Sequence, residues 1–321
     1  GSRAALRGRL PGATPAGIEC NVPTGGEVIT SFGPAFVIEQ PDLPAMGMPQ
    51  PGPSRHLLQN LQLMYGVGPV TENRLRAEGY TDLVSLLSHP RWGCEARRMV
   101  EAIEEGDLTK LRLAGARESE LLTFFGPDEI AVVDIETAGL ARALPVFLIG
   151  VAWQDGESWR RRQFLARDFD EERGVLSLAS DFFAGRPGLI SYNGRAFDVP
   201  FLQARLAFHG MNRISFLLHL DIYQETRRME GVFSDRKLHT VIHHMFGLHR
   251  GDDIPGYLVP ELYFRYLQES RPELLQPILE HNARDLEDVC RLVELCFLFP
   301  GDRMWLQKAA GVEQRSYAEG L

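Results

Sequence analysis

Two carboxylates separated by one residue follow a strongly apolar stretch, and they are the first candidates for chemistry. Residues 130–133 are all apolar, and Asp134 and Glu136 come next, with one isoleucine between them. Because side chains alternate along a strand, both acids are expected on one face. Neighbouring carboxylates repel each other and lose hydration, a conflict that a hard cation such as Mg²⁺ or Mn²⁺ relieves. Taken alone, the pair could also be the solvated edge of a sheet.

Two further acids and a histidine extend this set. Asp198 follows a strand-like stretch and an Asn-Gly turn, immediately before a helical pattern. His281 and Asp285 stand four residues apart in the last long helical pattern, so they share one face of a helix. A histidine titrates near neutral pH and can accept a proton from water. The alternatives are that Asp198 caps a helix and that His281 is a surface side chain paired with Asp285 or Asp288.

The elements that would position these residues alternate between strands and helices. Strands are expected at 130–135, 146–153, 162–166, 189–192 and 218–222, and helices at 171–184, 200–209, 237–246, 259–269 and 272–299. This order predicts an α/β fold in which helices flank a mixed sheet. We assign it to residues 119–300, followed by a C-terminal tail at 301–321.

The N-terminal part of the chain has a different character. Residues 1–55 are rich in Gly and Pro, and 27–40 alternate well enough to form a β-hairpin, which we expect to be an appendage. Residues 56–118 have helical periodicity and predict four short helices in two hairpins. The first of these hairpins has the sequence Y-G-V-G-P at 65–69.

The three acidic motifs together resemble those of the DEDD exonuclease superfamily. The matching stretches are D-I-E-T-A-G-L at 134–140, Y-N-G-R-A-F-D at 192–198 and H-N-A-R-D at 281–285. The closest resemblance is to the bacterial YprB-like ribonuclease-H-like group, which has stretches similar to G-D-D-I-P-G at 251–256. This resemblance covers about residues 120–300, within the usual size of one domain. It implies a ribonuclease-H-like fold and a metal-dependent nuclease.

The resemblance also implies a role for each site residue. Asp134 would bridge two divalent cations about 4 Å apart, which clamp the scissile phosphate. Glu136 and Asp285 would complete the shell of one ion, Asp198 would bind directly or through water, and His281 would be the general base. In DEDD enzymes with a catalytic histidine, that residue usually lies five positions before the last Asp. Here the spacing is four, as in the tyrosine-bearing branch.

The resemblance and the motifs further suggest where nucleic acid would bind. Leu140 follows the first motif at the point where similar exonucleases wedge an apolar side chain against the terminal base, and we also assign Asn193 to substrate contact. The segment Gly66, Val67 and Gly68 resembles a helix-hairpin-helix element, in which glycines permit positive φ and a close approach to phosphate. The alternative is an αα-hairpin that only packs on the catalytic domain.

Composition sets the outer limits of these interpretations. The net charge of −9 argues against a protein covered in nucleic-acid-binding surface, although four short basic runs could line a groove, at 97–98, 160–162, 227–228 and 236–237. The four cysteines form no CxxC pair, and no Cys or acid completes a zinc site around His239 and His243. Apolar stretches such as 144–153 are too short to span a membrane, so we expect a cytoplasmic protein without a membrane partner.

These observations predict a metal-dependent 3′–5′ exonuclease with two Mg²⁺ or Mn²⁺ ions. We expect DNA rather than RNA as the nucleic-acid partner because of the helical hairpin. The alternatives are a structure-selective endonuclease or a ribonuclease on the same site, and a non-catalytic nucleic-acid-binding module. A complete acidic set argues against the last, since clustered acids without a metal are costly.

Overall fold

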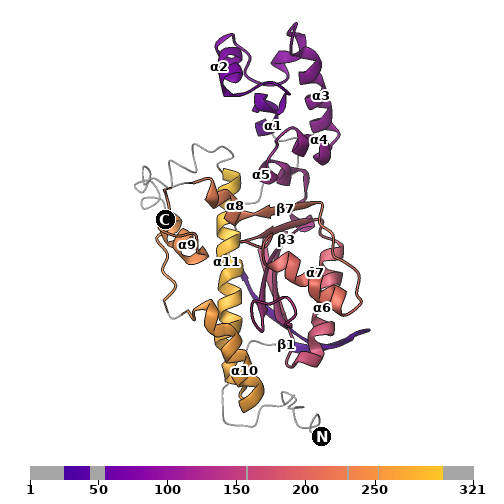
Figure 1. The fold of residues 1–321 in the computed structure, drawn as a ribbon, viewed down its shortest axis with the longest axis vertical. Helices are drawn as coiled ribbons and strands as arrows, with labels where there is room; N and C mark the ends of the chain where they lie inside the picture. The colour runs from indigo at the N-terminus through magenta and orange to yellow at the C-terminus, as the bar shows by residue number, and fades with distance from the viewer. Residues whose placement is uncertain (1–24, 44–54, 157, 230, 252, 299–321) are drawn as a thin grey trace.

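A seven-stranded sheet forms the centre of the structure, a computed structural model that describes residues 25–43, 55–156, 158–229, 231–251 and 253–298 (Figure 1). Its strands are β1 Gly25–Thr30, β2 Gly33–Leu43, β3 Ile130–Thr137, β4 Val146–Asp155, β5 Ser158–Leu165, β6 Gly188–Ser191 and β7 Leu218–Asp221. In space they run β1-β2-β5-β4-β3-β6-β7. The pairs β3–β6 and β6–β7 are parallel, and the other neighbours are antiparallel. The expected mixed sheet is thereby confirmed.

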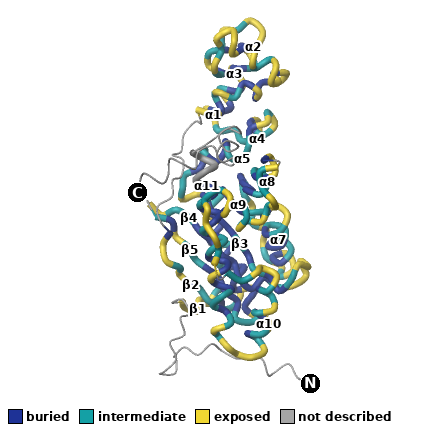
Figure 2. The backbone as a smooth tube through the Cα atoms, turned by 90° about the vertical axis from the view of Figure 1, so that its left-hand side faces the viewer, coloured by how far each residue is buried: buried dark blue, intermediate teal, exposed yellow. Residues whose placement is uncertain are grey.

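Helices cover both faces of this sheet. The helices of this part of the chain are α6 Glu172–Ala184, α7 Asp198–Phe208, α8 Ile222–Arg227, α9 Leu238–Phe246, α10 Val259–Glu269 and α11 Gln276–Leu298, with short 3-10 helices η5 Phe169–Glu171, η6 Gly256–Leu258 and η7 Pro272–Leu274. Figure 1 shows α11 along one side of the sheet and α6 and α7 on the other. Strands buried on both faces are apolar throughout rather than alternating, which explains the continuous runs in β3 and β4. Figure 2 shows that the buried residues follow these strands.

Strand β3 distributes its side chains between the two faces. Val133 belongs to the same apolar cluster as Phe201 of α7. Val132 belongs to the cluster that contains Leu286 of α11. Because side chains alternate, Asp134 lies on the same face as Val132, toward α11. The acids of β3 therefore face the helix that carries the third acidic motif.

The N-terminal hairpin is part of this sheet. Strands β1 and β2 form the hairpin expected within 27–40, with Thr30 paired to Gly33. We expected an appendage, but β2 pairs with β5 from Phe36 opposite Leu165 to Leu43 opposite Trp159, so the hairpin extends the sheet at one edge. The rest of the Gly- and Pro-rich segment, at 1–24 and 44–54, and the expected tail at 301–321 lie outside the described residues.

A helical module extends from one end of the sheet. It contains α1 Arg55–Gln59, η1 Leu61–Leu63, α2 Pro69–Ala77, η2 Ser85–Ser88, α3 Gly93–Glu104 and α4 Leu108–Leu113, and α5 Glu118–Leu121, η3 Leu122–Phe124 and η4 Pro127–Glu129 lead from it to β3. One of the four expected helices is thus the short 3-10 helix η2, and α4 is a further helix that was not expected. Among the described helices, none is long and apolar enough to cross a membrane.

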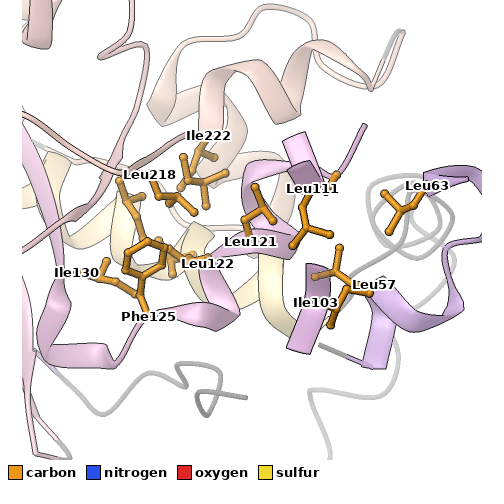
Figure 3. Close-up of a cluster of buried hydrophobic side chains, with 14 of the residues drawn as sticks. Leu57, Leu63, Ile103, Leu111, Leu121, Leu122, Phe125, Ile130, Leu218 and Ile222 are labelled. Carbon is orange, nitrogen blue, oxygen red and sulfur yellow. The ribbon is translucent and has the colours of Figure 1, made fainter. Parts of the chain in front are cut away.

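The apolar core continues from the module into the sheet. One cluster of buried side chains includes Leu57 and Leu111 of the module, Leu121 of α5, and Leu218 and Ile222 beside the sheet (Figure 3). Figure 3 shows these side chains as an unbroken series. The module is therefore packed onto the sheet. The domain boundary expected near residue 118, between the module and the α/β domain, stays a prediction.

Candidate active site

The site begins with the two acids of β3. Asp134 and Glu136 lie near the end of this strand and are half-buried. Although both side chains keep some contact with solvent, burial raises the pKa of each well above its ordinary value, and the carboxylate of Asp285 raises both further. Their ionised forms are thus disfavoured unless a positive charge is supplied.

Asp198 approaches the same strand from α7. It is the first residue of that helix and is only 5% exposed. The N-cap position belongs to Phe197, and Oδ1 of Asp198 instead accepts a hydrogen bond of 3.2 Å from the backbone N–H of Ile135. Burial raises the pKa of Asp198 to about 7, against the lowering effect of its backbone hydrogen bonds. This acid is therefore directed toward β3 rather than acting as a helix cap.

A turn stabilised by Asp221 precedes Asp198. The carboxylate of Asp221 accepts hydrogen bonds from the backbone N–H groups of Asn193 (2.7 Å) and Arg195 (3.1 Å). Asn193 itself has φ of 65°, one of the left-handed conformations that asparagine tolerates. Asp221 thus shapes the turn that leads into α7.

Helix α11 brings His281 and Asp285 to the same region. Nε2 of His281 is 3.8 Å from Oδ2 of Asp285, as expected for residues one turn apart. His281 is buried, and its Nδ1 lies 2.9 Å from Oδ1 of Asp253. The alternative of a surface histidine paired with Asp285 or Asp288 is therefore wrong about the surface position, although the pairing with Asp285 that it named is present.

Arg250 is a cation among the acids that the sequence did not single out. Its Nη1 is 2.5 Å from Oδ1 of Asp285 and 3.1 Å from Oδ2 of Asp253. Its Nε donates a hydrogen bond of 2.8 Å to Oδ2 of Asp288. The contact with Asp285 is an ion pair without good hydrogen-bond geometry, since Oδ1 of Asp285 is buried with no hydrogen-bond partner. The only sequence signal for this group was the G-D-D-I-P-G stretch that follows Arg250.

The four acids fit a hard cation by chemistry rather than by their present side-chain positions. The carboxylate of Asp285 on α11 raises the pKa values of Asp134 and Glu136 of β3 and of Asp198 of α7, so the four acids lie close together. Carboxylate oxygens are the ligands that Mg²⁺ and Mn²⁺ prefer. Yet within the described part of the chain no three His, Cys, Asp or Glu side chains form a group that could hold a metal ion.

Of the remaining predicted contacts, Leu140, Gly66 and Gly68 are exposed, whereas Val67 is buried. Leu140 is 86% exposed, in the loop between β3 and β4. In the module, Gly66 has φ of 82°, whereas Gly68 has extended backbone with φ of −100°. The expectation that both glycines provide positive φ therefore holds for Gly66 alone. The side chain of Val67 is buried between the two glycines.

Comparisons with known proteins found two similar chains. Uncharacterized protein YprB of Bacillus subtilis (strain 168) is 30% identical over 169 residues, which cover 50% of this chain and 40% of that protein. The chain thus spans well under half the length of this relative. A family B DNA polymerase from the hyperthermophilic archaeon Pyrobaculum calidifontis is 19% identical, with a TM-score of 0.44 over 56% of this chain and 27% of the polymerase chain.

The family model decides the classification. A model described as RNase_H superfamily (RNase_H_2) matches residues 131–297. This match runs from β3 through α11 and includes all four acids of the site. Because it covers more than half of the sequence, the chain belongs to the RNase H superfamily.

Proposed function

We propose that the chain is a metal-dependent nuclease that hydrolyses phosphodiester bonds of DNA from the 3′ end. The observation that carries the proposal is the convergence of four carboxylates from β3, α7 and α11, with the pKa values of Asp134, Glu136 and Asp198 all raised. Retaining such a group is costly without a counter-charge. Residues with perturbed pKa values that cluster in this way are typical of catalytic sites.

Asp134, Glu136, Asp198 and Asp285 would hold two Mg²⁺ or Mn²⁺ ions. When bound, two such ions supply an activated water and stabilise the leaving oxygen of the phosphodiester. His281 would take the proton from that water through Nε2, because Nδ1 is already hydrogen-bonded to Asp253. Holding one ring nitrogen in this way selects the tautomer and the orientation of the ring.

Substrate contacts would come from two places. Leu140, exposed beside the acids of β3, would pack against the terminal base, and Asn193 in the turn before Asp198 would contact the backbone. Backbone N–H groups of the Gly66–Gly68 hairpin would bind phosphates further along the strand. We prefer DNA because this hairpin resembles a DNA-binding element. Phosphate contacts position the substrate but do not specify its sequence.

The test uses substrates labelled at one end. Purified protein is incubated with single-stranded and duplex DNA and RNA, each labelled at the 5′ or the 3′ end, with Mg²⁺, with Mn²⁺, or with a chelator. A 3′–5′ exonuclease releases labelled mononucleotide from 3′-labelled DNA at once and shortens 5′-labelled DNA stepwise. Cleavage of a circular strand would identify an endonuclease, and preference for RNA a ribonuclease. Binding of nucleic acid with no hydrolysis under any condition would instead identify a non-catalytic module.

A further inference from the structure

A row of residues across the sheet leads to Asp134. Asp134 of β3 lies opposite Gly150 of β4, and Gly150 lies opposite Gln163 of β5. Residues directly opposite each other in paired strands project from the same face. Because glycine has no side chain, a gap separates the carboxylate of Asp134 from the amide of Gln163.

Asn282 of α11 fills this gap. A Cβ added at Gly150 would lie 2.1 Å from Oδ1 of Asn282, closer than any real contact, so only glycine permits this packing. Asn282 and Gln163 are both completely buried, at 0% exposed. Two buried amides in contact need all their hydrogen-bonding groups satisfied, or they destabilise the fold.

These amides form a continuous chain of hydrogen bonds, which we call the amide relay and define as Gln40, Gln163 and Asn282. Nε2 of Gln40 donates to Oε1 of Gln163 at 2.6 Å. Nε2 of Gln163 donates to Oδ1 of Asn282 at 2.8 Å. Nδ2 of Asn282 then donates to Oδ2 of Asp134 at 2.7 Å. The relay thus connects the N-terminal hairpin to the carboxylate of Asp134.

The direction of the relay is fixed by groups that can only accept. Nε2 of Gln163 also donates to the backbone carbonyl of Leu279, at 2.8 Å. Nδ2 of Asn282 also lies 3.2 Å from the backbone carbonyl of Asp134. Reversing either amide would bring oxygen against oxygen, so each amide has one satisfactory orientation. A buried network satisfied in this way is rigid.

We propose that the amide relay positions the carboxylate of Asp134 for binding a divalent cation. The relay binds Oδ2 through one amide and leaves Oδ1 outside its hydrogen bonds, so the carboxylate is presented in one rotamer. This role rests on the proposed function, in which Asp134 binds the metal. Groups that orient a metal ligand through a hydrogen bond typically change metal affinity about 10- to 100-fold when removed.

The first experiment measures Mn²⁺ binding to the metal-free full chain by calorimetry. Asn282→Leu and Gln163→Leu each replace one amide with a branched hydrocarbon that cannot form hydrogen bonds, and we expect about 10- to 100-fold weaker binding for Asn282→Leu. Because Gln163 acts through Asn282, the double variant should bind no more weakly than Asn282→Leu alone. The matched control is Gln203→Leu, whose amide donates to the carbonyl of Ile214 at 2.6 Å and is not part of the relay.

A second pair of variants separates positioning from loss of a polar group. Gly150→Ala keeps every amide but displaces Asn282, so its Mn²⁺ affinity should fall as in Asn282→Leu. Gly26→Ala is the control, because a Cβ there meets nothing within 4 Å. Circular dichroism and the midpoint of thermal unfolding in chelator identify variants that do not fold. If Asn282→Leu or Gly150→Ala does not fold, the Mn²⁺ affinity of Gln163→Leu, whose side chain does not touch Asp134, is compared with that of wild type instead.

The outcomes distinguish the relay from the metal assignment. If Asp134→Asn loses Mn²⁺ binding while folded Asn282→Leu and Gly150→Ala both bind within about twofold of wild type, the relay has no positioning role. If Asp134→Asn binds Mn²⁺ as wild type does, the proposed metal centre itself is wrong. With nucleic acid as substrate, a positioning role further requires that kcat falls in Asn282→Leu while KM stays unchanged.

Discussion

His281 of α11 is hydrogen-bonded to Asp253, 28 residues earlier in the chain, with 2.9 Å between Nδ1 and Oδ1. A carboxylate in this position fixes which ring nitrogen carries the proton and how the ring is oriented. Nε2 therefore points toward Asp285, 3.8 Å from its Oδ2. Asp253, in the loop before α10, thus holds the ring of His281 with Nε2 beside the acids. A spacing of four residues between His281 and Asp285 therefore still allows the histidine to accept a proton there.

Asp134→Asn should abolish phosphodiester hydrolysis and leave the fold intact. The change removes the charge proposed to bridge the two ions, while the asparagine oxygen can still accept the hydrogen bond from Asn282. Since the pKa of Asp134 is raised by burial and by its neighbours, the midpoint of thermal unfolding in chelator should be unchanged or higher. The control is Asp170→Asn, at an exposed position in η5. Activity of Asp134→Asn within about tenfold of wild type would contradict the assignment.

His281→Ala should lower kcat by about 10² to 10⁴, the usual contribution of a positioned general base. Asp253→Ala should lower it by less in wild type and not at all in the His281→Ala background, because Asp253 acts through the histidine. Asp253→Asn keeps an acceptor for Nδ1–H and should be intermediate. Single-turnover rates over a range of pH test the cycle. If His281→Ala keeps the full rate and the same pH profile, the histidine is structural.

The stability of the metal-free protein should depend on pH through Asp198. Its pKa is about 7 in the folded chain against an ordinary value of 3.8. Between these values the folded chain holds a proton that the unfolded chain has released, so this group lowers the free energy of unfolding as pH rises. The slope is at most about 1.4 kcal/mol per pH unit. The free energy of unfolding, measured by urea denaturation in chelator, should fall less steeply with pH in Asp198→Asn than in wild type. Equal slopes in the two proteins would show that Asp198 is not the origin of the pH dependence.

Gly68→Val tests the helical hairpin as a phosphate clamp. Its backbone is extended and a Cβ meets nothing within 4 Å, so the fold should tolerate valine while the side chain blocks a close approach of phosphate. We expect KM for long duplex DNA to rise, independently of base sequence, with kcat unchanged. Gly185→Val, at another open glycine, is the control. Unaltered affinity at one fixed salt concentration would mean that the hairpin only packs. A point substitution is preferable to deleting residues 57–115, because the deletion would expose the apolar core that the module shares with the sheet.

Arg205→Met should destabilise the protein by about 3 to 5 kcal/mol, as expected when one partner of a buried ion pair is removed. Arg205 and Glu172 are both buried, and Nε and Nη2 of Arg205 donate hydrogen bonds of 2.7 and 2.6 Å to the carboxylate of Glu172. Its Nη1 also donates to the carbonyl of Ala143, in the loop that carries Leu140. Arg265 forms an exposed ion pair with Glu269. Arg265→Met should therefore change the free energy of unfolding, measured by urea denaturation, by no more than about 0.5 kcal/mol. A similar loss in both variants would argue against the pair.

The sheet and its flanking helices were predictable because their signals are local. The continuous apolar run before Asp134 and the helical pattern around Asp285 each depend on a few neighbouring residues. The pairing of the N-terminal hairpin with β5 was not predictable, since Ile38 and its partner Gln163 are far apart in sequence and register across strands is set in the folded state.

The same distinction applies to the candidate site. The four acids and His281 were predicted from the sequence, because their residue types and their order along the chain are typical of such a site. Arg250 and Asp253 were missed because their contacts with α11 come from a loop whose path depends on tertiary packing. Asn282 lies inside a recognised motif, yet its contact with Asp134 depends on the glycine at 150, which was not identifiable without the register of β4.

Because the apolar cluster that includes Leu57 and Ile222 is shared by the module and the sheet, we expect the two to unfold as one cooperative unit. If the module opened first, Leu121 and Leu218, which are buried in the shared cluster, would be exposed to water. Burial of apolar surface is worth about 25 cal/mol per Å², so such partial unfolding is strongly disfavoured. We therefore expect the helices at 55–113 to exchange their amide hydrogens as slowly as the strands they pack against. The position of the module on the sheet is then set by this packing and not by a flexible tether.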